Sequence, residues 1–316
     1  MDSAATDRFD TSRFEASRNR LASLAYRLLG SAADAEDAVQ DAFVHWQAAD
    51  RQRIMVPGAW LTKVVTNLCL DRLRSAQSRR ERTVAWLPEP LLDADPMLGP
   101  ADTFEQRESV SLAVLMLMER LSPVERAVYV LREAFSYSHT EIADILDITE
   151  SASQQHLHRA RRRVTAARRV GGEVDPASAR RIVEEFLAAA SSGRTERLVA
   201  LLTDDAIAIS DGVGLTETLL QYDTAQRIAA VARAGFTPTP AKRRLAGGTP
   251  AVHYALVNRA PAILFVVGDQ IVGAVTFDIA HGRIATVRGI AAPTRLTRLT
   301  EAWRQHEPDA PLVARW

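Results

Sequence analysis

Hydrophobic residues recur every three or four positions through residues 12–80, where glycine and proline are scarce. In "RFEASRNRLASLAYRLLG" this spacing places leucines and alanines on one stripe of a helix, and Gly30 ends it. A second helix is predicted over "SAADAEDAVQDAFVHWQAA", with Ser31 as its N-cap, and a third over "AWLTKVVTNLCLDRLRSAQSRR". We therefore predict a helical domain over residues 10–82.

A change of composition separates this domain from the next helices. Residues 83–103 hold four prolines, which is typical of a linker. Helical spacing returns over residues 104–170, where Ser122 and Pro123 have the pattern of a helix start and Glu125 stands where a capping box needs an acid. The sequence thus predicts a second helical domain.

The rest of the chain changes from helical to strand-like spacing. Two helices are predicted at "ASARRIVEEFLAAASS" and "TERLVALL", and later segments such as "AILFVVGD" are rich in residues that favour strands. Hairpin turns are expected at residues 268–269 and 281–282. Helices followed by antiparallel strands predict a separate α+β domain over residues 175–292, with a tail over residues 293–316.

Charge and cysteine content narrow the class of protein. The 316 residues include 39 basic and 39 acidic ones, so net charge says nothing about partners, but residues 151–170 hold six arginines and no acid. Such a run is the local footprint of a contact with a polyanion, and a solvated helix face is the alternative. The single cysteine, Cys69, excludes an internal disulfide, and we expect it to pack in a core because its neighbours are apolar.

Several functional classes lack their signatures in this sequence. Because it holds no apolar run of about 18 residues and no leader pattern, we expect a cytoplasmic protein with no membrane partner. No P-loop, G-x-S-x-G or H-E-x-x-H motif occurs, and no dense acidic cluster. We therefore expect no catalytic residue, no metal site and no cofactor.

Residues 136–164 predict two short helices around a tight turn. When the second helix is wound at about 100° per residue, its apolar side carries Ser153, Leu157, Ala160 and Val164. Its polar side carries Ser151, Gln155, His158, Arg159 and Arg162. Glutamine can pair with adenine and arginine with guanine in the major groove, so this pattern predicts a DNA-binding helix-turn-helix. Contacts with phosphates are expected from Arg161, Arg163, Arg168 and Arg169.

Both helical domains resemble one protein family. Extracytoplasmic-function (ECF) sigma factors, the bacterial subunits that direct RNA polymerase to promoters, have a fourth conserved region similar to "LSPVERAVYVLREAFSYSHTEIADILDITESASQQHLHRAR". The second region of the same family is similar to "LLGSAADAEDAVQDAFVHW" and "WLTKVVTNLCLDRLRS". The resemblance implies a sigma factor for stress responses, which binds core RNA polymerase together with double-stranded and melted promoter DNA.

The resemblance also assigns roles to residues. The fourth region reads the −35 element, which implies base contacts by Gln154, Gln155, His158 and Arg159, and phosphate contacts by Arg132 and Arg163, beside Ser151 and Arg162 from the polar side of the helix. Contacts with the melted −10 strand are implied for Lys63, Asn67 and Arg74. Docking on the clamp of the largest polymerase subunit is implied for Asp34, Glu36, Asp37, Gln40, Asp41 and Phe43.

The third domain resembles SnoaL-like domains, which are cone-shaped α+β folds with a curved sheet. A subgroup of ECF sigma factors carries such a domain, which implies a fused regulator with no separate anti-sigma factor required. "WLPEP" at 86–90 is similar to a linker signature of that subgroup, and "SDGVG" at 210–214 to an Asp-Gly-Gly-Gly-Lys loop, in which Val213 and Leu215 depart from the pattern. Contacts between the domains are therefore expected from Trp86, Leu87, Pro88, Glu89, Pro90, Asp211, Gly212 and Gly214.

Two other functions stay open at this point. A helix-turn-helix repressor or activator would act without binding polymerase and would not need the first domain. A SnoaL-type enzyme with an accessory DNA-binding region would need activity from the third domain, where Asp211, His253 and Asp278 are the candidates. The sequence pattern predicts neither an oligomeric state nor a promoter sequence.

Overall fold

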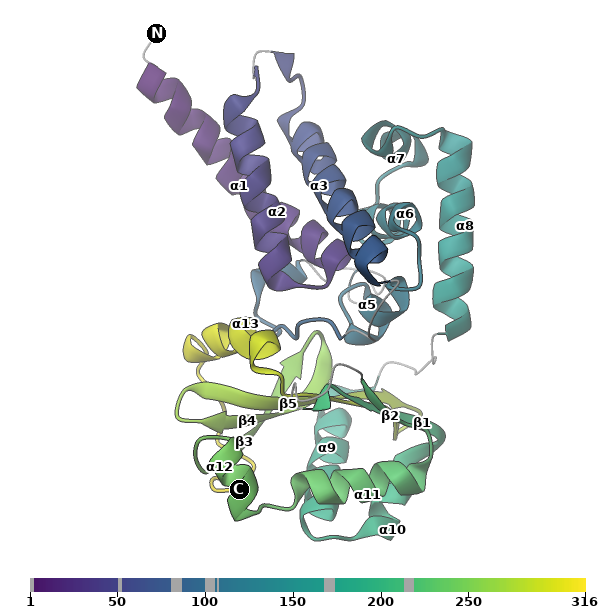
Figure 1. The fold of residues 1–316 in the computed structure, drawn as a ribbon, viewed down its shortest axis with the longest axis vertical. Coiled ribbons are helices and arrows are strands. Elements are labelled where there is room, and N and C mark those ends of the chain that lie inside the picture. The colour runs from purple at the N-terminus through teal and green to yellow at the C-terminus, as the bar shows by residue number, and fades with distance from the viewer. Residues whose placement is uncertain are drawn as a thin grey trace. The chain divides into compact units, whose positions relative to one another are not determined.

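The computed structural model describes residues 3–50, 53–80, 87–99, 106, 108–167, 174–212 and 219–316. The chain folds into two compact units (Figure 1). Unit 1 holds residues 1–83 and 95–168, and unit 2 holds residues 84–94 and 169–316. The first half of the proline-rich linker therefore belongs to the same unit as the C-terminal half of the chain.

Unit 1 is helical throughout its described residues. Its α-helices are α1 (Ser3–Leu29), α2 (Ala32–Ala48), α3 (Pro57–Arg80), α5 (Leu112–Met118), α6 (Pro123–Glu133), α7 (His139–Leu146) and α8 (Glu150–Ala167). A short 3₁₀ helix, η2 (Pro96–Leu98), precedes α5. The helices predicted from the hydrophobic spacing are confirmed.

The sharp turn between α1 and α2 follows from two local signals in the sequence. Gly30 adopts a positive φ of 67°, which a residue with a side chain disfavours, and its N–H donates to the carbonyl of Tyr26. The hydroxyl of Ser31 then accepts the N–H of Asp34 at 3.2 Å, so the predicted N-cap is confirmed. Small buried side chains of α2 face its neighbours α1 and α3, namely Ala35, Ala38 and Ala42.

Two buried arginines connect the N-terminal helices of unit 1 to its later ones. The Nε of Arg27 donates to Ser109 Oγ at 2.9 Å, and its Nη2 donates to the carbonyl of Leu98 at 2.9 Å. Arg126, on α6, forms an ion pair with Glu119 and donates to the carbonyl of Arg27. Because both guanidinium groups are satisfied by these partners, their burial is tolerated.

Unit 2 combines helices with one six-stranded sheet. Its strands are β1 (Leu202–Ser210), β2 (Leu220–Tyr222), β3 (Ala251–Val257), β4 (Ala260–Val267), β5 (Gln270–Ala280) and β6 (Arg283–Ile290). Its helices are α9 (Pro176–Ser191), α10 (Thr195–Leu201), α11 (Ala225–Phe236), α12 (Pro240–Leu245) and α13 (Pro293–Arg304). The strand order is β2-β1-β6-β5-β4-β3. This confirms the α+β class.

The sheet of unit 2 differs from the prediction in one pairing. β1 runs parallel to β6, whereas all other neighbours are antiparallel. After β2 the chain crosses to the far edge of the sheet through α11 and α12, two helices that the sequence pattern did not reveal, and four strands then return by hairpins to β1. The expected turns at residues 268–269 and 281–282 are confirmed.

The apolar core of unit 2 lies between the sheet and α9, α10 and α11, while α13 packs on the other side of the sheet (Figure 1). The ring of Phe186 meets the rings of Phe236 and Phe277 edge to face, at centroid distances of 5.6 and 5.0 Å. Trp316 closes this core: it packs on Phe265, and its indole N–H donates to the carbonyl of Phe236 at 2.9 Å. The tail after α13 is therefore an integral part of the unit.

Asp211 fixes the start of α13. Its carboxylate accepts the N–H of Ala291 at 3.0 Å and the N–H of Ala292 at 2.9 Å. Ala292 is the N-cap of α13 and offers no side-chain oxygen of its own. Asp211, which sequence reasoning assigned to an interdomain contact or a catalytic role, thus supplies the missing cap.

Replacing this residue tests the structural role. Asp211→Ala is expected to lower the free energy of unfolding by about 1–3 kcal/mol, because two N–H groups lose a charged acceptor. Asp204→Ala is the matched control, since Asp204 is 94% exposed and its ion pair with Arg283 lies on the surface, and it should cost under about 0.5 kcal/mol. Urea denaturation followed by tryptophan fluorescence measures both, and equal losses would contradict the role assigned to Asp211.

Candidate nucleic-acid interface

The predicted helix-turn-helix is formed by α7 and α8. Ser138 and Glu141 form a capping box at the start of α7, and α7 ends at Asp147, whose left-handed φ of 53° makes the tight turn. Thr149 Oγ1 accepts the N–H of Ala152 in the first turn of α8. The Nδ1 of His139 lies 2.9 Å from Ser153 Oγ and connects the two helices. Asp and Ser residues thus shape this turn through local hydrogen bonds.

The two faces predicted for α8 are present in the structure. Its inner face is buried and comprises Ser153, Leu157, Ala160 and Val164. The residues predicted for its outer face are all exposed, namely Ser151, Gln155, His158, Arg159 and Arg162, and Gln154 is exposed as well. The outer face offers amide, imidazole and guanidinium groups to a ligand, which are the groups that read base edges in a major groove.

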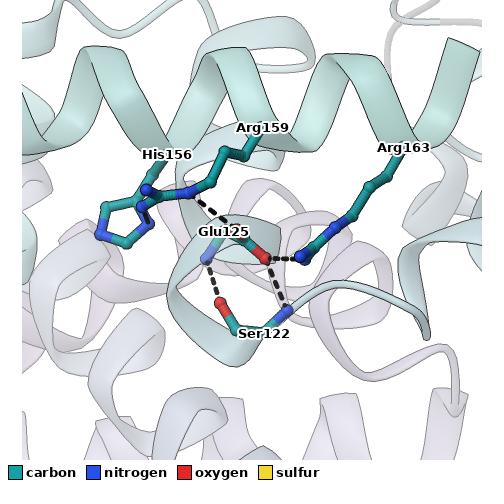
Figure 2. Close-up of polar contacts among 5 residues, drawn as sticks. All are labelled: Ser122, Glu125, His156, Arg159 and Arg163. Carbon is teal, nitrogen blue, oxygen red and sulfur yellow. Dashed lines mark hydrogen bonds and ion pairs between the residues drawn. The ribbon is translucent and has the colours of Figure 1, made fainter.

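Two arginines of α8 instead bind a carboxylate within the protein (Figure 2). Arg159 Nε donates to Glu125 Oε1 at 3.1 Å, and Arg163 Nη1 donates to Glu125 Oε2 at 2.5 Å. The same Oε2 accepts the N–H of Ser122 at 3.0 Å, while Ser122 Oγ accepts the N–H of Glu125 at 3.3 Å. The capping box predicted from "SPVE" is confirmed, and its acid also holds two residues that the resemblance assigns to DNA.

Burial and the polar partners of Glu125 shift its pKa in opposite directions, and the polar partners have the larger effect. Burial alone would raise the pKa of this carboxyl, but the hydrogen bonds from Ser122, the positive charge of Arg163 and the hydrogen bond from Arg159 outweigh it and lower the pKa below its ordinary value of 4.5. Glu125 is therefore ionised at neutral pH. Burial and the charge of Arg159, whose Nη2 lies 3.0 Å from Nδ1 of His156, lower the pKa of that histidine.

Other basic residues of this region also have partners within the protein. Arg161 forms an ion pair with Glu133 at 2.7 Å. Arg132 Nη1 donates to the carbonyl of Tyr137 at 2.9 Å. Sequence reasoning missed the acids because Glu125 and Glu133 lie on α6, 38 and 28 residues before their partners. The capping-box pattern predicted that Glu125 caps a helix, but it did not indicate the ion pairs of Glu125 with Arg159 and Arg163.

The residues assigned to polymerase docking lie along α2. Asp34, Glu36, Asp37, Gln40 and Asp41 are exposed. Phe43 is half-buried and packs on Phe14 with a centroid distance of 4.8 Å. Arg72 of α3 donates to Asp41 Oδ2 at 2.6 Å and to the carbonyl of Asp34. The structure thus brings these acids together on one exposed, largely acidic surface.

The residues assigned to the melted strand lie on α3. Lys63 Nζ donates to Asp147 Oδ1 at 2.7 Å and to the carbonyl of Asp144 at 2.8 Å, so it contacts the end of α7. Asn67 is half-buried, and Arg74 is exposed and pairs with Asp71 at 3.0 Å. The −10 candidates therefore share one helix, and Lys63 is engaged by the helix-turn-helix.

Two other residues of α3 have structural roles. Trp60 is half-buried and packs on Trp46 with a centroid distance of 5.7 Å. Cys69 is fully buried, and burial raises the pKa of its thiol to about 12. This thiol stays protonated and packs as an apolar group.

A second contact joins α3 and α1 to the segment before α7. The hydroxyl of Tyr137 accepts Arg20 Nη2 at 2.8 Å and lies 3.1 Å from Thr62 Oγ1. Together with Lys63, Asp144 and Asp147, these residues form what we call the polar joint of unit 1. The joint brings the −10 and −35 candidates into one compact unit.

The linker segment binds to the β3–β4 turn of unit 2. Leu91 N donates to the side chain of Asn258, whose own N–H donates to the carbonyl of Leu91. Asp93 accepts both the N–H and the guanidinium of Arg259 at 3.0 Å. Asn258 and Arg259 both have a positive φ, which an arginine rarely adopts, so these contacts hold a strained turn.

The linker and the loop at residue 211 meet at one helix end. Arg295, in the first turn of α13, donates to the carbonyl of Leu87, and Asp211 caps the same helix. Leu87, Pro88, Glu89, Pro90, Asp211 and Gly212 thus all lie within unit 2. Trp86 and Gly214, also assigned to this contact, lie outside the described residues.

Asp211 and Asp278, two of the three candidates for catalysis in unit 2, have hydrogen-bond partners within the fold. Asp278 forms two hydrogen bonds with Arg288, at 2.8 and 2.6 Å. His253 lies edge-on to Trp303, and burial lowers the pKa of its imidazole. The described residues include no group of three or more histidines, cysteines or acids placed to hold a metal ion. Within the same residues, no helix has the length and apolar content that crossing a bilayer requires.

Comparisons with known proteins match this architecture. Residues 13–79 match the family model Sigma-70 region 2, and residues 111–164 match Sigma-70, region 4. The ECF RNA polymerase sigma factor SigJ of Mycobacterium tuberculosis is 39% identical over 214 residues, which make up 67% of this chain and 68% of SigJ. The "Probable ECF RNA polymerase sigma factor SigI" of the same organism is 31% identical over 90% of this chain and 94% of its own length.

A solved structure extends the match to the C-terminal unit. The crystal structure of the Mycobacterium tuberculosis ECF sigma factor SigJ superposes with a TM-score of 0.66 at 28% sequence identity. The match covers 91% of this chain and 98% of that one. It therefore includes the sheet and helices that follow the helix-turn-helix.

A pH series tests the charge assigned to Glu125. Glu125→Gln should lower the free energy of unfolding by about 1–2 kcal/mol at pH 7, with allowance for the partial exposure of both arginines. A carboxyl with a lowered pKa stabilises the fold above its ordinary pKa, and this stabilisation is lost as the pH falls through the lowered value. Denaturation of both proteins between pH 7 and about pH 3 should therefore show the difference shrinking below pH 4.5. A constant difference would contradict the assignment.

Proposed function

The chain belongs to the ECF family of RNA polymerase sigma factors, and we propose that its C-terminal unit regulates the sigma activity by holding the linker between regions 2 and 4. As a sigma factor the protein binds core RNA polymerase and directs promoter-specific initiation of transcription. Sigma factors are not enzymes. The observation that supports the regulatory proposal is the set of hydrogen bonds from Leu91 and Asp93 to the β3–β4 turn of unit 2.

The promoter sets the distance that regions 2 and 4 must span. The −35 and −10 elements lie about 25 base pairs apart, which is roughly 85 Å of duplex at about 34 Å per ten base pairs. In unit 1, the polar joint instead holds α3 against α7. Helices in direct contact cannot occupy both elements, so the two regions separate when the promoter is bound.

The linker determines how far they can separate. About 30 residues lie between the end of α3 and the start of α5. Fully extended, they would reach roughly 100 Å, more than the promoter requires. The hydrogen bonds of Leu91 to Asn258 and of Asp93 to Arg259 hold part of the linker on unit 2, so this part is not available to extend. Holding the linker therefore favours the compact state, and releasing it favours the state that reaches both elements.

The surfaces of unit 1 support the assignment of partners. The exposed acids of α2 suit a basic surface of the polymerase clamp, and Arg74 with Asn67 suits the backbone and bases of a melted strand. Gln154, Gln155, His158 and Arg162, on the outer face of α8, suit the −35 duplex. A regulator within the same chain would act without a separate anti-sigma factor.

Binding, rather than catalysis, is the function that the C-terminal unit supports. Asp211 caps a helix and Asp278 pairs with Arg288, so both carboxylates serve the fold. An enzyme of the SnoaL type would need such groups aimed at a substrate. The rival proposal of a helix-turn-helix regulator without polymerase leaves the region 2 match unexplained.

Breaking the linker contact in the full chain tests the regulatory proposal. The double variant Asp93→Ala, Arg259→Ala should raise the yield of run-off transcription with core polymerase about two- to fivefold, since up to about 1 kcal/mol no longer favours the compact state. The double variant Asp204→Ala, Arg283→Ala removes an ion pair of unit 2 that does not touch the linker, and it should match wild type. An unchanged or lowered yield in the first variant would refute linker control.

A further inference from the structure

Glu125 both caps a helix and binds two arginines. The capping box of Glu141 shows that capping does not require such ion pairs. Glu141 caps α7 with the same pair of bonds to Ser138, and within the part of the chain that the structure describes no arginine pairs with it. Glu125 caps α6 and in addition binds Arg159 and Arg163. Capping therefore does not explain why two arginines, one helical turn apart on the DNA-facing helix, converge on this carboxylate.

The burial of Glu125 favours the state in which both arginines stay bound to its carboxylate. The side chain of Glu125 is 6% exposed, whereas those of Arg159 and Arg163 are 48% and 51% exposed. A buried carboxylate without counter-charges would be costly, whereas each arginine could readily return to water. The carboxylate thus draws both guanidinium groups towards α6, as Figure 2 shows.

The position of the cluster relates it to DNA binding. Arg159 and Arg163 lie beside the outer face of α8, which carries Gln155, His158 and Arg162. Arginines free to swing at that edge would bind phosphates of any sequence, which raises affinity without raising specificity. An arginine held by a carboxylate contributes less to such binding, because its charge is already partly neutralised.

We propose that Glu125 is a specificity-determining residue of the −35 reader, which positions Arg159 and Arg163 away from non-specific phosphate contacts and leaves recognition to the outer face of α8. The inference rests on the proposed −35 contact of α8. Glu125 acts through the two arginines, so it is a positioning residue and touches no DNA itself.

The test compares Glu125→Gln with wild type in the holoenzyme. Glutamine keeps an oxygen that can accept the N–H of Ser122, so the helix cap is retained while the charge is lost. Binding is measured by fluorescence anisotropy between about 50 and 200 mM salt. One duplex carries the −35 element that the wild-type holoenzyme selects, and the other has this element scrambled.

The expected result is a change in salt dependence together with a loss of discrimination. On the scrambled duplex, the slope of log K against log salt should steepen by about 1 to 2, since each additional phosphate contact adds about 0.9. The ratio of specific to non-specific affinity should fall by about three- to tenfold. Adding Arg163→Gln to the Glu125→Gln variant should reduce this steepening, because one of the two released arginines is then missing.

Glu141→Gln is the matched control, because it removes the charge of a capping box to which no arginine is bound. It should leave both the slope and the discrimination ratio at wild-type values. A slope for Glu125→Gln that is unchanged or shallower, or equal effects of the two glutamate variants, would overturn the inference. A wild-type holoenzyme that does not discriminate between the duplexes would instead refute the −35 role of α8, and the inference would fall with it.

Discussion

The polar joint between α3 and the helix-turn-helix is the constraint on which the rest of the structure depends. Lys63 binds the end of α7, and Tyr137 binds Arg20 and Thr62. Apart from the buried Thr62, the groups of this joint are at least partly exposed to water, so each of their contacts contributes little to stability. Such a joint holds two DNA-binding regions together and releases them at a cost that polymerase and promoter contacts can offset.

Ion pairs also hold residues of α8 and of the linker in place. The Glu125 carboxylate of α6 forms ion pairs with two arginines of α8, and Asp93 of the linker forms one with Arg259 of unit 2. In each case a charged side chain or a segment of the linker is held by a partner distant in sequence. A chain with zero net charge can bind a polyanion, because basic groups such as Arg162 are presented locally on one helix face.

Local signals in the sequence predicted much of the fold and part of the site. Gly30, Ser31 and the capping box at Ser122 act within a few residues, so their consequences could be read directly, as could the two faces of α8. The parallel pairing of β1 with β6 and the position of α11 depend on packing across the unit. The partners of Arg159, Arg163 and Lys63 are separated from them by 34, 38 and 84 residues, and no local pattern encodes such a contact.

The separation of regions 2 and 4 is the central claim, and a distance measurement tests it directly. Spin labels on Gln47→Cys of α2 and Thr165→Cys of α8 occupy exposed positions, and the buried Cys69, with a thiol pKa of about 12, should not react. Double electron–electron resonance should give a distance beyond about 60 Å in the holoenzyme on its promoter and a clearly shorter one in the free chain. The same distance in both states would contradict the account.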